Sequence, residues 1–191
     1  MKHLLLFLIL LISFQSYSQN MGWRNGLIVT QKSDTIMCLL PITLDFGKVV
    51  AYKLNNEQYE KYMSIKDIKY LATETSVYEN IGYLKKGKEI HKIMWLQEEG
   101  KLNLYTETQA GIGSPRSFAG GTFTPFNKLD LIYVLKKDGI NYVIDPKKFV
   151  ESITPLIADN DELVKKVVAK EYTYENIGAL INEYNTAATK E

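Results

Sequence analysis

From Asn25 to Asp145 the sequence alternates short runs of β-branched and aromatic residues with tight turns. The clearest turn is Lys137-Asp138-Gly139 between "LDLIYVLK" and "INYVID", because Asp-Gly between such runs is a strong hairpin signal. Three further hairpins are expected, in "GLIVTQ" with "TIMCLLPI", "KVVAYKL" with "EQYEKYM", and "EIHKIMWLQ" with "KLNLYTE". "IKYLAT" and "VYENIGYL" are shorter candidate strands. This regular spacing predicts an antiparallel β barrel or sandwich.

The alternation of side chains also indicates where two strands lie in the sheet. "HKIMWLQ" carries apolar residues on both of its faces, which is typical of a central, well-covered strand. "EQYEKYM" has mixed and charged faces, so we expect it at an edge.

After Asp145 the apolar period changes from two to that of a helix. Pro146 suits a first helical turn, Pro155 ends or kinks the first helix, and Thr173 caps the last one. The expected buried stripes are Phe149, Val150, Ile153 and Ile157; Leu163, Val167 and Val168; and Ile177, Leu180, Ile181 and Tyr184. Two or three amphipathic helices therefore close the chain and pack on the sheet, which makes the fold class α+β.

The N-terminus has the pattern of a secretory signal peptide. An unbroken apolar run extends from Leu4 to Ile12, and Ser16 and Ser18 supply small residues before a cleavage site. The expected organisation is a signal peptide over 1–18, an antiparallel β domain over 19–145 and a helical segment over 146–191.

The apolar run is too short to span a bilayer, which takes roughly 20 residues, and no later stretch approaches that length. We therefore expect a soluble mature protein without a transmembrane segment, in the periplasm or secreted. Lipid anchoring through an N-terminal cysteine is not indicated, because Cys38 lies too far downstream.

Charge and composition exclude several classes of function. The formal net charge is +1, which gives no electrostatic reason to expect nucleic acid or an anionic membrane as a partner. Arg24 and Arg116 are the only arginines, so a surface built for phosphate recognition is not expected. The single cysteine, Cys38, cannot form an intrachain disulfide, and the fold must be held by its core.

None of the short motifs predicts a catalytic or metal site. "GYLKKGK" from Gly82 matches most of a phosphate-binding loop, but Glu89 replaces the required Ser or Thr and a strand follows in place of a helix. His91 is the only histidine of the mature chain, and its neighbours are strand residues. Cys38 lies in an apolar setting and is interpreted as a core residue. We expect no catalytic residue, no metal and no cofactor.

Carboxylates and tyrosines leave two weaker alternatives open. Glu98-Glu99 lies at an expected hairpin tip, and Asp159 and Asp161 lie at a helix start, where they satisfy amide donors. A pair of carboxylates facing each other across a cleft would instead indicate a hydrolase. Tyrosines recur through the strand region, where most pack in the sheet, although some could stack against sugar or peptide.

The segment 108–127, "TQAGIGSPRSFAGGTFTPFN", is the best candidate binding site. A loop of this length in a compact domain is often functional. Arg116 could contact an anion, while Phe118, Phe123 and Phe126 could present an apolar patch. The alternative is that the phenylalanines pack on the end of the sheet and the segment is only a connection.

Several stretches resemble a group of short exported proteins common in Bacteroidota, whose domain also occurs ahead of outer-membrane barrels. They are "GLIVTQKSDTI", "SIKDIKYL", "EEGKLNLYTE" and the closing "DNDELVKKVVAKEYTYENIGALINEYN". Ser33 replaces the group's turn glycine, and Tyr70 replaces the glycine that follows its Ile-Lys pair. The resemblance implies an exported protein and supplies no known activity.

Three hypotheses of function follow. The first is a non-enzymatic interaction module of the cell envelope, with another envelope protein as its partner. The second is a small glycan- or peptide-binding protein that uses the tyrosines and the segment 108–127. The third is a carboxylate-dependent hydrolase. The absence of a recognisable catalytic motif favours the first.

Overall fold

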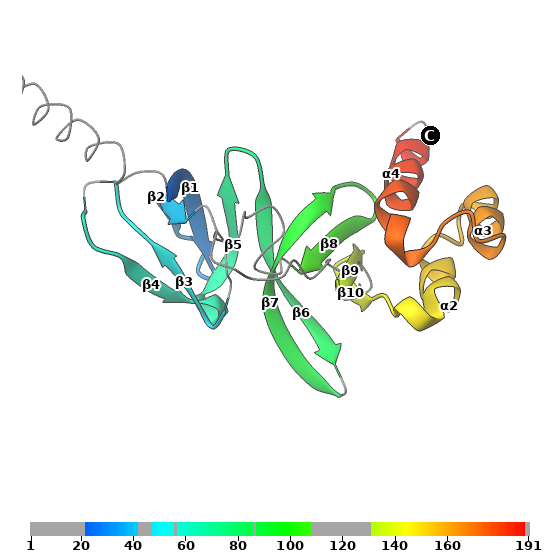
Figure 1. Cartoon of the computed structure of the whole chain (residues 1–191), viewed down its shortest axis with the longest axis horizontal. Helices are drawn as coiled ribbons and strands as arrows, with labels where there is room; N and C mark the ends of the chain where they lie inside the picture. The colour runs from blue at the N-terminus through cyan, green and yellow to red at the C-terminus, as the bar shows by residue number, and fades with distance from the viewer. Residues whose placement is uncertain (1–21, 42–46, 56, 86, 108–130, 190–191) are drawn as a thin grey trace, which may run out of the picture.

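The computed structural model describes residues 22–41, 47–55, 57–85, 87–107 and 131–189. In this part of the chain, eight antiparallel strands form one sheet in the order β10-β9-β8-β7-β6-β5-β1-β2 (Figure 1). The strands are β1 (Trp23–Thr30), β2 (Thr35–Pro41), β5 (Ile68–Thr73), β6 (Val77–Lys85), β7 (Lys88–Glu98), β8 (Asn103–Glu107), β9 (Tyr133–Lys137) and β10 (Ile140–Val143). The sheet is open and not closed into a barrel. The predicted α+β fold, an antiparallel sheet followed by helices, is confirmed.

A second, two-stranded sheet extends the first beyond β2. It contains β3 (Val49–Tyr52) and β4 (Lys61–Ser64), and a bridge between Leu39 and Lys53 joins it to β2. A short 3-10 helix, η1 (Ile65–Asp67), leads from β4 into β5. As predicted, the strand from "EQYEKYM" pairs on one side only, while β7 lies between β6 and β8.

Two hairpin turns have the backbone that their sequences suggest. Asp138 and Gly139 have φ of 51° and 80°, the two positive values that a type I′ turn needs. Between β1 and β2, Ser33 has a φ of 69°. A residue with a Cβ bears a steric cost in this left-handed conformation, which glycine adopts freely.

The two faces of the eight-stranded sheet are distinguished by register. On what we call the inner face, the register aligns Glu79, Met94 and Glu107. On the outer face it aligns Tyr78, Trp95 and Thr106. Alternate residues of each strand point to opposite faces, so these two rows assign the neighbouring positions as well.

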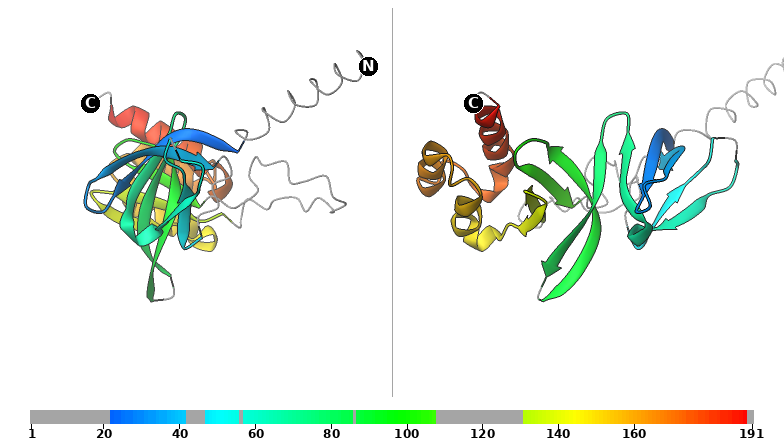
Figure 2. Two further views of the ribbon diagram at one scale, coloured as in Figure 1. Left: turned by 90° about the vertical axis from the view of Figure 1, so that its left-hand side faces the viewer. Right: turned by 180° about the vertical axis from the view of Figure 1, so that it is seen from behind.

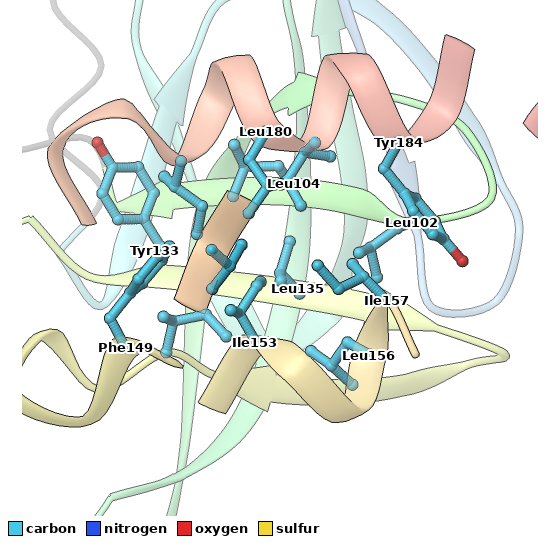
Figure 3. Packing of buried hydrophobic residues seen from close by; sticks show 14 of the residues in the cluster. Leu102, Leu104, Tyr133, Leu135, Phe149, Ile153, Leu156, Ile157, Leu180 and Tyr184 are labelled. Atoms are coloured by element: carbon cyan, nitrogen blue, oxygen red, sulfur yellow. The ribbon is translucent and has the colours of Figure 1, made fainter. Parts of the chain in front are cut away.

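The outer face carries two separate hydrophobic cores, at opposite ends of the sheet (Figures 1 and 2). The first, the strand core, lies where β3, β4 and η1 cover β1, β2 and β5. Its buried members are Ile28, Cys38, Leu40, Val50, Ile68, Leu71, Tyr78 and Ile93. The second, the helical core, lies where the C-terminal helices cover β8 and β9, and Leu104, Leu135, Ile153 and Leu180 meet at its centre (Figure 3).

The helical segment begins directly after β10. It consists of η3 (Pro146–Lys148), α2 (Phe149–Ile153), η4 (Thr154–Leu156), α3 (Asp161–Val168), η5 (Tyr174–Asn176) and α4 (Ile177–Ala188). The predicted stripes are buried except at two positions: Val150 is half-buried, and Val168 is exposed. Val168 is the last residue of α3 and follows the buried Val167, about 100° further around the helix. Among the described helices, none is long and apolar enough to cross a membrane.

Three consecutive residues near the end of α4 make polar contacts, two with the rest of the helical segment and one with the sheet. Glu183 accepts hydrogen bonds from Lys166 and Tyr172. Tyr184 donates its hydroxyl to Asp159, with 2.8 Å to each carboxylate oxygen.

Asn185 makes the contact with the sheet itself. Its Nδ2 donates to the Leu102 carbonyl at 2.9 Å, and its Oδ1 accepts from the Leu102 amide at 3.0 Å. A Cβ on the neighbouring Gly100 would lie 2.4 Å from the Asn185 side chain, so this close approach requires glycine. The amide of Asn185 thus pairs with Leu102 as a strand neighbour would.

We predict that Asn185→Ala lowers the free energy of unfolding by about 2–4 kcal/mol, because it leaves a buried amide and carbonyl of Leu102 unpaired. Asn182→Ala is the matched control: this exposed neighbour makes one bond to Glu98, at 3.3 Å, and its loss should change stability by no more than about 0.5 kcal/mol. Urea unfolding of both variants measures the difference. Equal midpoints would show that Asn185 does not hold α4.

We also predict that Ser33→Gly raises the free energy of unfolding by up to about 1 kcal/mol. Relief of the left-handed backbone is worth about 1–2 kcal/mol, and the greater freedom of glycine in the unfolded chain offsets about half of this. Ser33→Ala keeps the strain and should not stabilise. A lower denaturation midpoint for Ser33→Gly would contradict this account of the turn.

Candidate functional site

The inner face of the sheet curls tightly between β6 and β10. In a flat sheet the backbones of β6 and β9 would lie about 14 Å apart, three strand spacings. Yet Glu79 on β6 forms an ion pair with Lys136 on β9. At the far end of the curl, Asn141 on β10 donates from Nδ2 to the Gly82 carbonyl on β6 at 2.9 Å. The sheet therefore bends around its inner face and approaches closure at β6 through a side chain, without a backbone ladder.

The side chains in the interior of this curl are apolar. Ile81, Tyr83, Met94, Tyr105 and Val134 form one cluster, which we call the inner core, and all five are buried. They come from β6, β7, β8 and β9, so contact among them depends on the curl.

One polar group on the inner face is built on Glu79. Its Oε2 accepts the hydroxyl of Tyr105 at 2.5 Å, while its Oε1 accepts the Lys136 ammonium. Burial, together with the hydrogen bond to Glu79, raises the pKa of Tyr105. The phenol therefore stays protonated near neutral pH and serves as a hydrogen-bond donor.

A second polar group on the inner face is formed by side chains of β7 and β8. Lys92 pairs with Glu107, and their side chains are 33% and 20% exposed. Burial and the nearby Glu107 charge raise the pKa of Tyr83, which is 4% exposed. The Tyr83 hydroxyl has no hydrogen-bond partner in the described part of the chain, and neither does Oδ1 of Asn141.

This arrangement suits binding better than acid–base catalysis. Glu79 and Glu107 both lie opposite Met94, so their backbones are about 10 Å apart. Each carboxylate already has a lysine partner, and Glu79 has the Tyr105 hydroxyl as well. Because both carboxylates are engaged by these partners, neither is available to a substrate as a nucleophile or general base. The paired charges instead lie over the buried inner core as neutral, strongly polar groups.

The structure does not describe the site residues that were predicted from sequence. Arg116, Phe118, Phe123 and Phe126 belong to the segment 108–130, which lies outside the described residues. The binding role of that segment stays a prediction.

Cys38 and His91 have the environments expected of non-catalytic residues. Cys38 is buried in the strand core, and burial raises the pKa of its thiol to about 11. His91 lies opposite Gly82, with Nε2 3.2 Å from Oε1 of Glu89. The stretch from Gly82 to Lys88, which matches part of a phosphate-binding loop, forms the β6–β7 hairpin.

Asp159 differs from its expected role. The residue that caps α3 is Asn160, whose Oδ1 accepts from the Leu163 amide. Asp159 instead pairs with Lys101 of the β7–β8 connection at 2.7 Å. That hydrogen bond, helped by Tyr184, lowers the pKa of Asp159 to about 2. The carboxylate is structural, since it joins the helical segment to the sheet.

Metal binding has no candidate in the described ranges, where no group of three or more His, Cys, Asp or Glu side chains is placed to hold an ion.

The inner-face residues were not identified from sequence. Glu79 and Lys136 are 57 residues apart, and each occurs in a strand without a recognisable motif. Side-chain alternation assigns Glu79 and Lys136 each to one face of its own strand. Only the order of the strands in the sheet, together with its bending, brings these two strands close to each other. Comparisons of the chain with protein-family models, with curated proteins and with solved structures found no match.

Proposed function

We propose that the protein is a non-enzymatic binding module of the cell envelope, and that it holds its partner at the inner face of the sheet. The observation that carries this proposal is that two lysine–carboxylate pairs remain partly exposed on the inner face, over an inner core that is itself buried. Polar side chains of this kind form hydrogen bonds at the rim of a protein interface.

The charges indicate the kind of partner. Glu79 with Lys136 and Glu107 with Lys92 are each neutral as a pair, so the inner face has no surplus of either sign. A strongly charged ligand would gain little there and would lose hydration. The surface suits an uncharged polar group, such as the backbone or side-chain amides of an envelope protein.

A carboxylate-dependent hydrolase is the less favoured alternative. It would need Glu79 or Glu107 to give up its lysine during the reaction. Turnover of glycoside, ester or peptide substrates by the purified mature chain, abolished by Glu79→Gln or Glu107→Gln, would establish that alternative and contradict a binding module.

The binding proposal predicts that the double variant Glu79→Gln/Lys136→Met loses a partner that the intact protein contacts. Crosslinking mass spectrometry on envelopes carrying the tagged protein measures this. Replacing both members of a partly buried pair is close to neutral for stability, so the variant should fold.

The matched control is Lys166→Met/Glu183→Gln, which removes an ion pair of similar exposure from the helices. The same partner should be recovered with this control and with the intact protein. Recovery of the partner with the inner-face variant as well would exclude the inner face as the binding surface.

Export is part of the same proposal. We predict that the protein purified from the periplasm or medium begins at Gln19, because the sequence before it has the pattern of a signal peptide. Intact-mass measurement of the exported protein checks the cleavage site. Leu8→Arg places a charge in the apolar run and should leave the full-length chain in the cytoplasm. If the intact chain and the Leu8→Arg variant were cleaved alike, the assignment of a signal peptide would be contradicted.

A further inference from the structure

The outermost strand at the strand-core end of the molecule has a free edge. β4 pairs with β3 on one side, and no strand of the described chain pairs with its other side. The two strands lie at the end of the molecule remote from the helices (Figure 1). None of the four residues of β4 is buried, and the residues from Glu57 to Glu60 that lead into it are exposed.

The pairing of β4 with β3 determines which backbone groups lie on this free edge. The Ile65 amide donates to the Lys48 carbonyl at 3.1 Å, one position beyond the end of β4. Hydrogen-bonded and non-hydrogen-bonded pairs alternate along an antiparallel ladder, so Met63 bonds to β3. The N–H and C=O groups of Tyr62 and Ser64 therefore point away from β3, to the free edge.

The edge of β4 lacks the features by which proteins usually prevent the pairing of edge strands. The strand contains no proline, and its register with β3 has no bulge. Its one charged residue, Lys61, is held by Glu57 at 2.9 Å. At the other end of the sheet, by contrast, the edge strand β10 lies against β6, to which Asn141 donates. Of these two edges, β4 is the one at which a further strand can add.

Two apolar side chains beside the edge are exposed on the same face of the small sheet. Tyr62 is 64% exposed and Val49 is 46% exposed. Val49 lies opposite Ser64 in the ladder, and alternate residues of β4 share a face, so Tyr62, Ser64 and Val49 lie together. The small serine lies between the exposed valine and the edge.

We propose that the protein forms a symmetric dimer in which the β4 strands of two copies pair antiparallel, with the two-fold axis at Met63. This register places Tyr62 of each copy opposite Ser64 of the other. All four outward backbone groups of each edge are then bonded, because each of the two residues supplies one N–H and one C=O. The two small sheets become one sheet of four strands.

The side chains of the two copies fit each other in this register. Tyr62 lies beside Ser64 of the second copy, and the next residue across the sheet is that copy's Val49. A side chain as small as serine lets the phenol ring lie across it and cover the exposed valine. The Tyr62 hydroxyl is bonded to Glu60 at 2.9 Å in the single chain, an exposed contact that is worth little to stability and is released by a change of rotamer.

Geometry and charge favour this register over its neighbours. An axis at Tyr62 would place the Ser64 groups opposite Glu60, which lies outside the strand. An axis at Lys61 would set two lysines directly opposite each other, which is destabilising. An unrelated extended peptide could bond to the same backbone groups, but it would not supply the serine–valine surface that receives the Tyr62 ring. The partner that the edge fits is therefore a second copy of the chain, joined as an isologous dimer.

Cysteine crosslinking tests the pairing directly. In a hydrogen-bonded antiparallel pair the Cα atoms lie about 5.5 Å apart, which is within the range of a disulfide. A mixture of Tyr62→Cys and Ser64→Cys should therefore give a crosslinked dimer on oxidation. Each variant alone should not, because in this register a residue lies about 8 Å from its own counterpart. The native Cys38 is 2% exposed and does not take part.

Sedimentation equilibrium of the purified mature chain measures the dimer without a crosslink. Ser64→Pro removes the outward N–H, and the backbone accepts proline because Ser64 has a φ of −63°. The dimer then loses two hydrogen bonds, so its dissociation constant should rise about fivefold or more. Ser64→Ala is the matched control. It loses the same hydroxyl, which accepts from the Lys66 amide at 3.3 Å, but it keeps the N–H and should dimerise as the intact chain does.

Three results would overturn the proposal. They are a monomer at every accessible concentration, equal dissociation constants for Ser64→Pro and Ser64→Ala, and a disulfide in Tyr62→Cys alone as readily as in the mixture. The crosslinking result does not depend on Ser64→Pro and decides the question if that variant fails to fold. Glu79→Gln/Lys136→Met leaves the β4 edge intact and should dimerise normally, so the dimer and the inner-face partner can fail separately.

Discussion

The curl of the sheet around its inner face is the constraint on which the rest of the structure depends. The ion pair between Glu79 and Lys136 exists only because β6 and β9 approach each other on that side. Bending toward one face makes the other convex, and a single flat layer cannot cover a convex surface. The outer face is accordingly covered in two parts, by β3, β4 and η1 at one end and by the helices at the other. The exposed interval at Trp95 follows from this division.

The helical cover is attached to the sheet by polar contacts as well as by its core. Residues Glu183, Tyr184 and Asn185 of α4 each bind a different element: α3 and the residues after it, the α2–α3 connection, and the β7–β8 hairpin. Hydrophobic packing alone would leave α4 free to slide along its axis, since apolar contact is non-directional. Two hydrogen bonds between Asn185 and the Leu102 backbone fix the position. The closing Glu-Tyr-Asn is therefore explained by attachment of the helices, without reference to a ligand.

The sequence predicts local structure here far better than it predicts the site. Asp138-Gly139 and the change of period after Asp145 define the last hairpin and the start of the helices, because turn geometry and burial stripes are local properties. The curl is not local. It depends on β10 reaching β6 and on a bulge in β7, between Leu96 and Glu98, that shifts the register with β8. Alternation read without that bulge would assign Glu98, at the end of β7, to the wrong face. The pairing of Glu79 with Lys136 could not be predicted for the same reason.

Strand β8 contributes side chains to both faces of the sheet. Tyr105 points to the inner face, where it binds Glu79, and the next residue, Thr106, points to the outer face beside Trp95. Among the described residues, one buried hydroxyl on each face has no hydrogen-bond partner: Tyr83 of β6 on the inner side and Thr106 of β8 on the outer side. Cores that serve only stability satisfy such groups or replace them with apolar residues of similar shape. Because the two hydroxyls lie on different strands, β6 and β8, each face has an unsatisfied group of its own, while the lysine–carboxylate pairs and the α4 contacts keep β8 in place.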